Sequence, residues 1–304
     1  MYIRRSHHLH HDEVERVQLQ MVPPKVTTPK HKAPPAPPHL QWLMDTGKPL
    51  KTADGRVVKV MEFHHKNDDS VLSAWAKHFR NQYCRDEQID ALRKGTPHSR
   101  AQYLTNLRFP DAAQAPGPSI RSGDFAEVLV SDYLEFTMQF WLPRTRYDRK
   151  AVRNESTKGT DIIGFRFARE GKFDPKDTLA LFETKAQFSG TSPTKRLQTA
   201  VDDSAKDEMR KAESLNAIKQ RLLDDGKSLH AEKVERFQNP EDSPYTEQYG
   251  AVALLTTPVF DLSEIKTTTT SAHPQDRDLT LIVIHGKEMM ALVHTLYERA
   301  ANEA

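Results

Sequence analysis

Cysteine is almost absent from this sequence, with Cys84 the only one among 304 residues. A single cysteine excludes an intrachain disulfide framework and a Cys-rich zinc finger. Long apolar runs are lacking too, because no stretch approaches the roughly 18 to 20 apolar residues that cross a bilayer. This excludes a membrane protein. Polar residues rather than an apolar core follow Met1, so we expect no secretory signal and a cytoplasmic protein.

The sequence also lacks an excess of charge of either sign. Its 44 Lys and Arg residues are balanced by 42 Asp and Glu residues, which leaves a formal charge of +2. A protein with so little net charge has no general attraction to nucleic acid. Contacts with nucleic acid would have to come from local clusters of basic residues.

Proline is concentrated at the start of the chain. Seven of the 19 prolines lie within the first forty residues. Proline removes backbone donors, and this segment offers little apolar surface to offset the entropy of ordering. We therefore expect residues 1–40 to form a disordered Pro/His-rich extension. Glycines and prolines between residues 95 and 120 mark a second boundary.

Between these boundaries, residues 41–118 are predicted to form an N-terminal α+β subdomain. Asp54-Gly55 is a hairpin turn signal, with a strand after it at 57–63 and a helix over 70–94. Residues 119–304 then predict an α/β core in which a central sheet is flanked by helices. Its expected elements are a helix at 123–141 that begins at Ser122 or Asp124, strands at 161–167 and 178–186, a helix at 194–223, strands at 249–256 and 279–284, and a helix at 287–301.

Candidate catalytic side chains lie where two predicted strands meet. Glu183 and Lys185 are two apart on one strand, so their side chains leave the same face. An apolar run leads into them, and burying such a pair carries a desolvation cost. Asp161 begins the preceding strand and comes close to Glu183 if the two strands form a hairpin. Carboxylates a few Å apart need a cation between them, and Mg²⁺ or Mn²⁺ suits such oxygen ligands. The alternative is a solvated salt pair near a sheet edge.

Two further polar residues belong to this hypothesis. Glu127 lies among apolar residues one turn into the predicted helix at 123–141. It could complete the metal shell, or it could only complement the helix dipole in the first turn. Gln187 is next in phase after Lys185 and could touch the substrate or a metal-bound water. For Gln187 the favoured alternative is an ordinary polar strand end.

Three motifs carry a family resemblance. They are Gly-Asp-Phe-Ala-Glu at 123–127, Lys-Gly-Thr-Asp-Ile-Ile-Gly-Phe at 158–165 and Glu-Thr-Lys at 183–185. Together they resemble the PD-(D/E)xK nuclease superfamily, and more narrowly the HamA family of nuclease subunits from Hachiman anti-phage defence systems. Thr160 departs from the usual proline before the aspartate. The resemblance runs from about residue 55 to the C-terminus.

What the resemblance implies is a Mg²⁺- or Mn²⁺-dependent DNA nuclease with a restriction-endonuclease-like core and a mixed sheet. Asp161, Glu183, Lys185 and Glu127 would be catalytic, and the three acids would bind the metal. The partner implied is a helicase subunit of the HamB kind. Docking could use the extension, the mixed-charge segment at 196–236 or the subdomain at 41–115. We favour the subdomain because of its large apolar groups Trp42, Trp75, Phe79 and Tyr83, whose alternative role is core packing.

A basic segment leads into Asp161 and supports DNA as the substrate. Arginine and lysine contacts with phosphate position a nucleic acid without reading its sequence. A solvated basic loop is the alternative for any one of these residues, which are Arg144, Arg146, Arg149, Lys150, Arg153 and Lys158. Competing functions are a non-catalytic DNA-binding or assembly module of the same fold, and a nuclease of restriction or repair.

Overall fold

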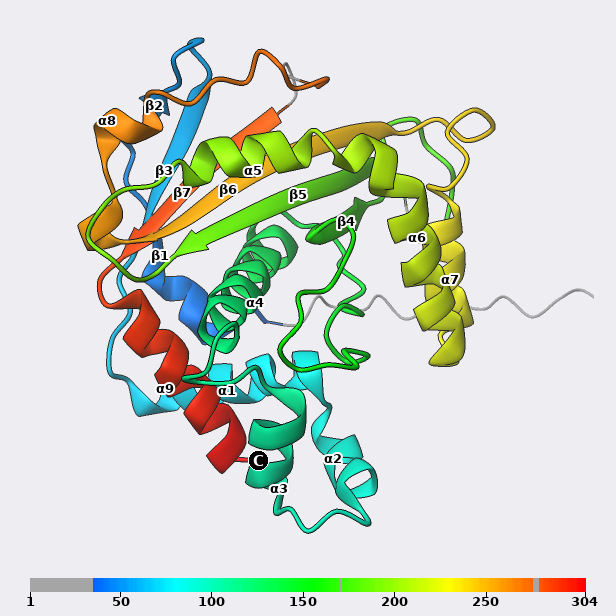
Figure 1. The fold of residues 1–304 in the computed structure, drawn as a ribbon. Coiled ribbons are helices and arrows are strands. Elements are labelled where there is room, and N and C mark those ends of the chain that lie inside the picture. Colours follow the sequence, from blue (N-terminus) through cyan, green and yellow to red (C-terminus); the bar gives the residue numbers. More distant parts are fainter. Residues whose placement is uncertain (1–34, 170, 276–278) are drawn as a thin grey trace, which may run out of the picture. The chain divides into compact units, whose positions relative to one another are not determined.

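The computed structural model describes residues 35–169, 171–275 and 279–304, and Ala36–Ala304 forms one compact unit (Figure 1). Most of the predicted extension therefore lies outside the described residues. Its predicted end at residue 40 is wrong, because the short 3-10 helix η1 (Pro38–Trp42) belongs to the compact unit. The reason is His39, a fully buried side chain bonded to Asp132.

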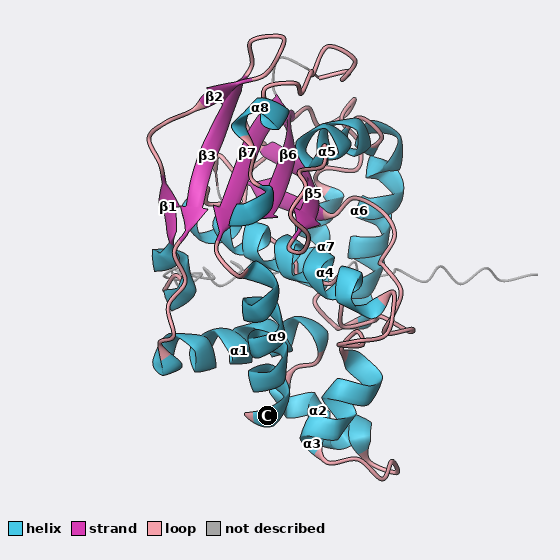
Figure 2. Ribbon diagram, turned by 60° about the vertical axis from the view of Figure 1, so that its left-hand side comes forward, coloured by secondary structure: helices cyan, strands magenta, loops and turns pink. Residues whose placement is uncertain are grey.

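One mixed sheet holds the described strands in the order β1-β3-β7-β6-β5-β4, with β2 paired to β3. Strands β3, β7, β6 and β5 run parallel, whereas β1, β2 and β4 are antiparallel to their neighbours. Figure 2 shows β1, β3, β7, β6 and β5 side by side in this order. The strands are β1 (Leu43–Asp45), β2 (Leu50–Lys51), β3 (Val57–Phe63), β4 (Ile162–Arg166), β5 (Thr178–Gln187), β6 (Thr246–Thr256) and β7 (Leu279–Gly286).

The strand predictions are confirmed. Asp54-Gly55 makes the turn between β2 and β3, and Gly55 takes a φ of 84° that suits glycine. Strand β6 lies between β5 and β7, as its apolar sequence indicated. The predicted hairpin forms as well, because β4 and β5 pair antiparallel with Ile162 opposite Phe182. This register brings the start of β4 beside the second half of β5.

Helices cover both faces of the sheet (Figure 1). On one face, side chains of α1, α4 and α9 such as Trp75, Phe125 and Leu296 belong to one buried cluster with Phe182 of β5. On the other face, α5, α6 and α7 pack over β4 to β7. The helices are α1 (Asp69–Tyr83), α2 (Asp86–Arg93), α3 (Arg100–Tyr103), α4 (Gly117–Asp132), α5 (Arg196–Ser204), α6 (Asp207–Asp224), α7 (Ser228–Glu235), α8 (Leu262–Ile265) and α9 (Met289–Asn302). Shorter π and 3-10 turns are η2 (Leu104–Arg108), η3 (Tyr133–Thr137) and η4 (Thr257–Val259).

Several predicted helix boundaries are wrong. The helix expected over 70–94 is split into α1 and α2, because the side chain of Asn81 accepts the backbone N–H of Asp86 and starts a new helix there. Helix α4 begins at Gly117, before the predicted start at Ser122 or Asp124. Asp124 cannot cap a helix, because its buried carboxylate accepts hydrogen bonds from Tyr83 and Lys150. The mixed-charge segment at 196–236 forms the separate helices α5, α6 and α7.

Residues 41–118 share the sheet and core of the remaining chain. Strand β3 pairs with β7, and α1 packs against α9. The predicted boundary at residue 118 therefore does not separate two compact units. Trp42, Trp75, Phe79 and Tyr83 are all buried in the cluster formed with α4 and α9. The docking surface predicted from them is wrong, and the alternative of core packing is confirmed.

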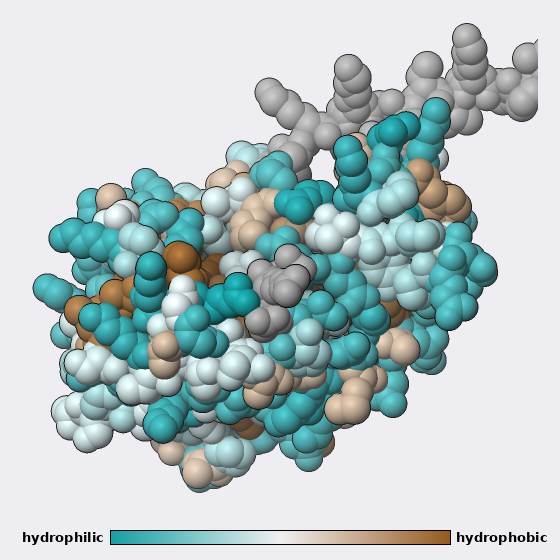
Figure 3. Space-filling model, turned by 90° about the horizontal axis from the view of Figure 1, so that it is seen from above, coloured by the Kyte–Doolittle hydropathy of each residue, from teal (hydrophilic) through white to brown (hydrophobic). Residues whose placement is uncertain are grey.

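The surface is mostly polar where Figure 3 shows it. On this face, seen from above Figure 1, hydrophobic side chains occur in small groups between hydrophilic ones. Within the described ranges, no helix combines the length and apolar character needed to cross a membrane.

Candidate active site

The structure brings together Asp161, Glu183 and Lys185, as the sequence predicted. The backbone N–H of Asp161 faces the Glu183 carboxylate, with 3.3 Å between the nitrogen and Oε1. Oδ2 of Asp161 accepts the backbone N–H of Thr184 at 3.0 Å. Nζ of Lys185 lies 3.3 Å from Oε2 of Glu183. The β4–β5 register produces this arrangement, because Asp161 precedes Ile162 and Glu183 follows its partner Phe182.

A second carboxylate, that of Asp203 in α5, also forms an ion pair with Lys185. Nζ of Lys185 lies 2.9 Å from Oδ2 of Asp203 at the end of α5. The other oxygen of Asp203 is bonded to Lys206 at 2.5 Å. Glu183 and Lys185 thus project toward α5 and α6, on the side of the sheet opposite α4. Lys185 is still partly exposed, so a substrate can reach its ammonium group.

A fourth acid, Asp207, was missed by the sequence reading. It is the first residue of α6 and fully buried, and its Oδ1 accepts the hydroxyl of Thr160 at 2.9 Å. Its Oδ2 is buried and receives no N–H or hydroxyl from a described residue. The Glu183 carboxyl group lies close enough to form a hydrogen bond with the Asp207 carboxyl group when one of the two is protonated. Asp207 therefore belongs to the same carboxylate cluster.

Glycine at position 159 lets the chain approach α6 closely. Its φ of 92° is a conformation that side chains other than glycine rarely adopt. A Cβ atom there would lie 3.0 Å from Oγ of Ser214. The next residue, Thr160, donates its backbone N–H to that same oxygen at 3.3 Å. The Lys-Gly-Thr segment before Asp161 is thus shaped by contact with α6.

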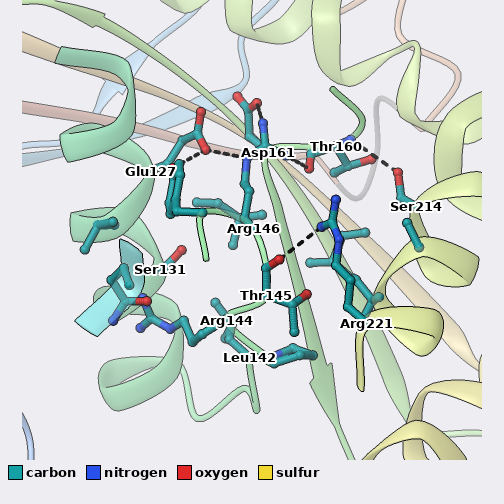
Figure 4. Close-up of a pocket in the computed structure, with 18 of the residues that line it drawn as sticks. Glu127, Ser131, Leu142, Arg144, Thr145, Arg146, Thr160, Asp161, Ser214 and Arg221 are labelled. Atoms are coloured by element: carbon teal, nitrogen blue, oxygen red, sulfur yellow. Dashed lines mark hydrogen bonds and ion pairs between the residues drawn. The ribbon is translucent and has the colours of Figure 1, made fainter. Parts of the chain in front are cut away.

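Glu127 reaches the site through Arg146 (Figure 4). Nε of Arg146 lies 2.7 Å from the Glu127 carboxylate, and its Nη2 lies 2.9 Å from Asp161. Nη1 of Arg146 also donates to the backbone carbonyl of Thr160 at 2.6 Å. Tyr147 donates its hydroxyl to Glu127. The cation between these two acids is therefore an arginine side chain.

Burial shifts the pKa values of the clustered acids upward. Desolvation, followed by the nearby charges of Asp161 and Asp207, raises the pKa of Glu183 to about 10. Desolvation raises the pKa of Glu127 to about 8, although Arg146 acts in the opposite direction. For Asp207, desolvation raises the pKa to about 6. Carboxyl groups of this kind take up a proton or a cation readily, because crowding disfavours a set of bare negative charges.

The chemistry of these donors fits a hard divalent cation. Carboxylate oxygens are the ligands that Mg²⁺ and Mn²⁺ prefer, and Asp207 offers an oxygen with no N–H or hydroxyl bound to it. Across the residues that the structure describes, no three His, Cys, Asp or Glu side chains are grouped closely enough to hold a metal. A divalent ion would have to compete with Arg146 and Lys185, which are bonded to the same carboxylates.

Most of the basic segment is occupied by ion pairs inside the protein. Lys150 is only 4 % exposed and cannot meet a phosphate in this arrangement. Lys158 is exposed and has no ion-pair partner among the described residues. The other pairs are Arg144 with Asp132 and Glu135, Arg146 with Glu127 and Asp161, Arg149 with Asp224 and Asp225, Lys150 with Asp124, and Arg153 with Asp111.

Gln187 has a structural role. Its side-chain amide donates to the carbonyl of Ser192 at 2.9 Å and accepts the hydroxyl of Thr194 at 2.6 Å. These bonds hold the loop between β5 and α5. This arrangement agrees with the alternative of an ordinary polar strand end.

A pocket lies beside the acids, between α4 and α6 (Figure 4). Its walls are α4, residues 142–147, the start of β4 and one face of α6. Its lining includes Glu127, Arg146, Thr160 and Asp161, together with Ser214, Ala217 and Arg221 of α6. No sequence motif pointed to these α6 residues. Their spacing along a single helix face was the one signal that could have found them.

Comparison with known families gives a match over nearly the whole compact unit. The family model described as HamA matches residues 38–300 of the chain. This range includes η1, the entire sheet, the carboxylate cluster and the pocket. Among curated proteins, the search finds no significant match.

Proposed function

Because the chain belongs to the HamA family, we propose that it is the nuclease subunit of a Hachiman anti-phage defence complex, and that it hydrolyses DNA phosphodiester bonds. The family match supports the role in defence. The activity is proposed from the side chains at the end of the β4–β5 hairpin. We also propose that the mixed sheet is a core of the restriction-endonuclease type, in the PD-(D/E)xK superfamily.

The observation that carries the proposed activity is the meeting of Asp161, Glu183 and Lys185. Asp161 directly precedes β4, and Glu183 and Lys185 belong to β5. The backbone nitrogen of Asp161 lies 3.3 Å from Oε1 of Glu183. Lys185 is 3.3 Å from Glu183 and remains accessible. A buried acidic pair next to a reachable ammonium group is costly in a purely structural role, and it suits the stabilisation of charge on a phosphate.

Lys185 acts as a cation in this proposal. Burial lowers its pKa, but the charges of Asp161, Glu183 and Asp203 more than compensate, so the pKa lies above its ordinary value. The side chain therefore stays protonated at neutral pH and is a poor general base. It can orient a water molecule by hydrogen bonding, and it can neutralise charge that develops on the scissile phosphate.

A divalent metal ion is the expected cofactor. Asp161, Glu183 and Asp207 would hold Mg²⁺ or Mn²⁺, and Glu127 would contribute from α4 once released by Arg146. When bound, the metal would supply Lewis acidity toward the phosphate and an activated water. The protein's own part is to keep the carboxylates crowded and partly desolvated, so that a cation is favoured there.

We propose a helicase subunit as the partner that restrains the nuclease. A nonspecific nuclease would attack host DNA, so its activity needs control. The sequence contains no Gly-x-x-x-x-Gly-Lys-[Ser/Thr] loop that could bind ATP for this purpose. Sensing driven by ATP would then have to come from another chain.

The direct test is incubation of the purified protein with supercoiled plasmid DNA. We expect nicked and linear products with Mg²⁺ or Mn²⁺ and none with EDTA. A parallel reaction with single-stranded RNA separates deoxyribonuclease from ribonuclease activity. Intact plasmid with both metals, together with a measured affinity for DNA, would support a non-catalytic DNA-binding module instead.

A further inference from the structure

Three basic side chains near the site are not neutralised by an ion pair. Lys158, Arg210 and Arg221 have no carboxylate oxygen within 4.0 Å among the described residues, whereas Arg149 and Arg153 do. Lys158 is exposed, and the two arginines are half-buried. A cation without an ion-pair partner is available to a phosphate at a lower cost, because no internal ion pair has to break.

Two of the three lie on one face of α6. Arg210 and Ser214 are four residues apart, and Ala217 and Arg221 are four apart further along, so all four side chains share a face of the helix. The eleven steps from Arg210 to Arg221 cover about 16 Å at 1.5 Å per residue. One strand of B-DNA passes roughly five phosphates over that length, at about 3.4 Å per step.

This face begins beside the carboxylate cluster. Arg210 is one turn after Asp207, and the charge of Arg210 acts on the Asp207 carboxylate. Asp207 is in turn bonded to Thr160. Ser214 is bonded to the backbone of Thr160, directly before Asp161. Arg221 lies across the pocket from Glu127 and donates to the carbonyl of Thr145 at 3.1 Å (Figure 4).

Lys158 contributes to the same pocket from the loop before β4. It lines the pocket together with Ser214 and Arg221, and it is one residue before Gly159, which contacts α6. Basic groups from a loop and from a helix thus face one space that leads to Asp161. A strand lying there would carry its phosphates past Asp161, which lines the same pocket.

We propose that the face of α6 formed by Arg210, Ser214 and Arg221, together with Lys158, binds the phosphates of the DNA strand next to the cleavage site. This surface takes the place of the basic segment at 144–153, whose cations are held in ion pairs. The proposal rests on the proposed nuclease function, and it names the surface that holds the substrate. Because the contacts are to phosphates, binding along α6 reads no base sequence.

The test is DNA binding in EDTA, where cleavage does not interfere. Fluorescence anisotropy with a short labelled duplex, and with its single strand, is measured over a series of salt concentrations. The deciding variants are Lys158→Gln and Arg210→Gln, because neither side chain has a hydrogen bond to another described residue whose loss could disturb the fold. Arg221→Gln is the third. The matched controls are Arg149→Gln from the basic segment and Lys219→Gln, a lysine of α6 bonded to Glu235 of α7.

A plot of log K against log salt concentration has a negative slope. We expect each of the three variants to reduce the magnitude of this slope by about 1. For the duplex this corresponds to a loss of roughly eightfold in affinity at 0.1 M salt, equal for unrelated sequences. The controls should keep the wild-type slope. Unchanged binding by Lys158→Gln and Arg210→Gln, with a reduced slope for Arg149→Gln, would overturn the α6 surface and leave the nuclease proposal standing. A wild-type protein that binds neither duplex nor single strand would overturn both.

Discussion

Arg146 and Asp161 form an ion pair at the start of β4, with 2.9 Å between Nη2 and Oδ1. The sequence assigned the arginine to DNA and the aspartate to a metal ion, but in the structure they neutralise each other. The same guanidinium also contacts Glu127. Arg146 therefore links α4 to the edge of the sheet and balances two of the acids proposed to be catalytic.

Arg146→Gln should make the stability of the protein depend on divalent ions. Without the guanidinium, the acids Glu127 and Asp161 face each other without a counterion. Removing one partner of such a buried ion pair lowers the free energy of unfolding by about 3 kcal/mol, and a bound metal ion can restore part of that stability. Thermal denaturation should show a lower Tm for the variant and a larger rise in Tm with Mg²⁺ than in the wild type. The control is Arg149→Gln, and equal metal responses in all three proteins would refute the role of Arg146 as a counterion.

Asp207→Asn should weaken metal binding without disturbing the fold. The amide keeps the bond that Asp207 accepts from Thr160, but it removes a charge that would face the metal. Titration calorimetry with Mn²⁺ should give a lower affinity for this variant, and for Asp161→Asn, than for the wild type. Asp203→Asn serves as a control, because Asp203 contacts Lys185 and Lys206 and is not proposed as a ligand. Equal affinities for wild type and Asp207→Asn would remove Asp207 from the metal site.

The same variant should change how stability depends on pH. Burial raises the pKa of Asp207 from 3.8 to about 6 in the folded protein. For an acid shifted upward, the folded state is favoured while the group is protonated, and that advantage is lost as pH rises from about 4 through about 6. Urea denaturation should therefore show Asp207→Asn gaining stability relative to the wild type over this window. A constant difference between the two proteins from about pH 4 to about pH 8 would contradict the shifted pKa.

The hydrogen bond between His39 and Asp132 attaches η1 to α4. From Asp132 we expect a contribution to stability with the opposite pH dependence to that of Asp207. Burial alone would raise the pKa of Asp132, but Arg144, His78 and His39 hold it well below its usual range. The ionised Asp132 carboxylate therefore stabilises the folded state fully when the pH is above about 3.9, the pKa of an aspartate in the unfolded chain. This stabilisation is lost as the pH falls below that value.

Asp132→Asn should therefore cost about 3 kcal/mol near neutral pH, and less in acid. Tryptophan fluorescence during urea unfolding can follow this, because His39 stacks on Trp75 with ring centroids 4.2 Å apart. Asp90→Asn is the control, since the ion pairs of Asp90 with Arg93 and Arg100 lie at the protein surface. A cost that stays the same at about pH 3 as at about pH 7 would show that ionisation of Asp132 is not the cause.

The strands and the catalytic trio could be predicted because their signals are local. An apolar lead-in identified β5, and its closeness to Asp161 was expected if the two neighbouring strands formed a hairpin. Helix ends could not be predicted in the same way, since distant bonds decide them. Asn81 starts α2, and Asp124 is buried against Tyr83 and Lys150 instead of capping a helix.

The role of each basic residue could not be predicted from local sequence patterns either. The partners of Arg149 and Arg153 lie 42 to 76 positions away in the chain. Asp207 escaped notice because the break between α5 and α6 leaves no mark in the spacing of apolar residues. Without that break, Asp207 reads as one more charged residue on an exposed helix.

Co-expression with a neighbouring helicase tests the proposed complex. A tag on one subunit should retain both at low and moderate salt. Because Trp42, Trp75, Phe79 and Tyr83 are buried, the interface must use other residues. Surface substitutions on α5 to α7 are the first choice for mapping it. Failure to co-elute at both salt concentrations would favour a nuclease that acts alone.

The central claim is that Glu183 and Lys185 carry out phosphodiester hydrolysis, and plasmid cleavage by their variants tests it most directly. Lys185→Met and Glu183→Gln should each lower the rate of nicking in Mg²⁺ by about 100-fold or more, the scale of losing one charge-stabilising group. Lys206→Met is the matched control, because Lys206 shares Asp203 with Lys185 but does not contact Glu183, and it should cleave like the wild type. Circular dichroism should show all of the proteins folded. Wild-type rates of nicking in folded Lys185→Met or Glu183→Gln would contradict the claim.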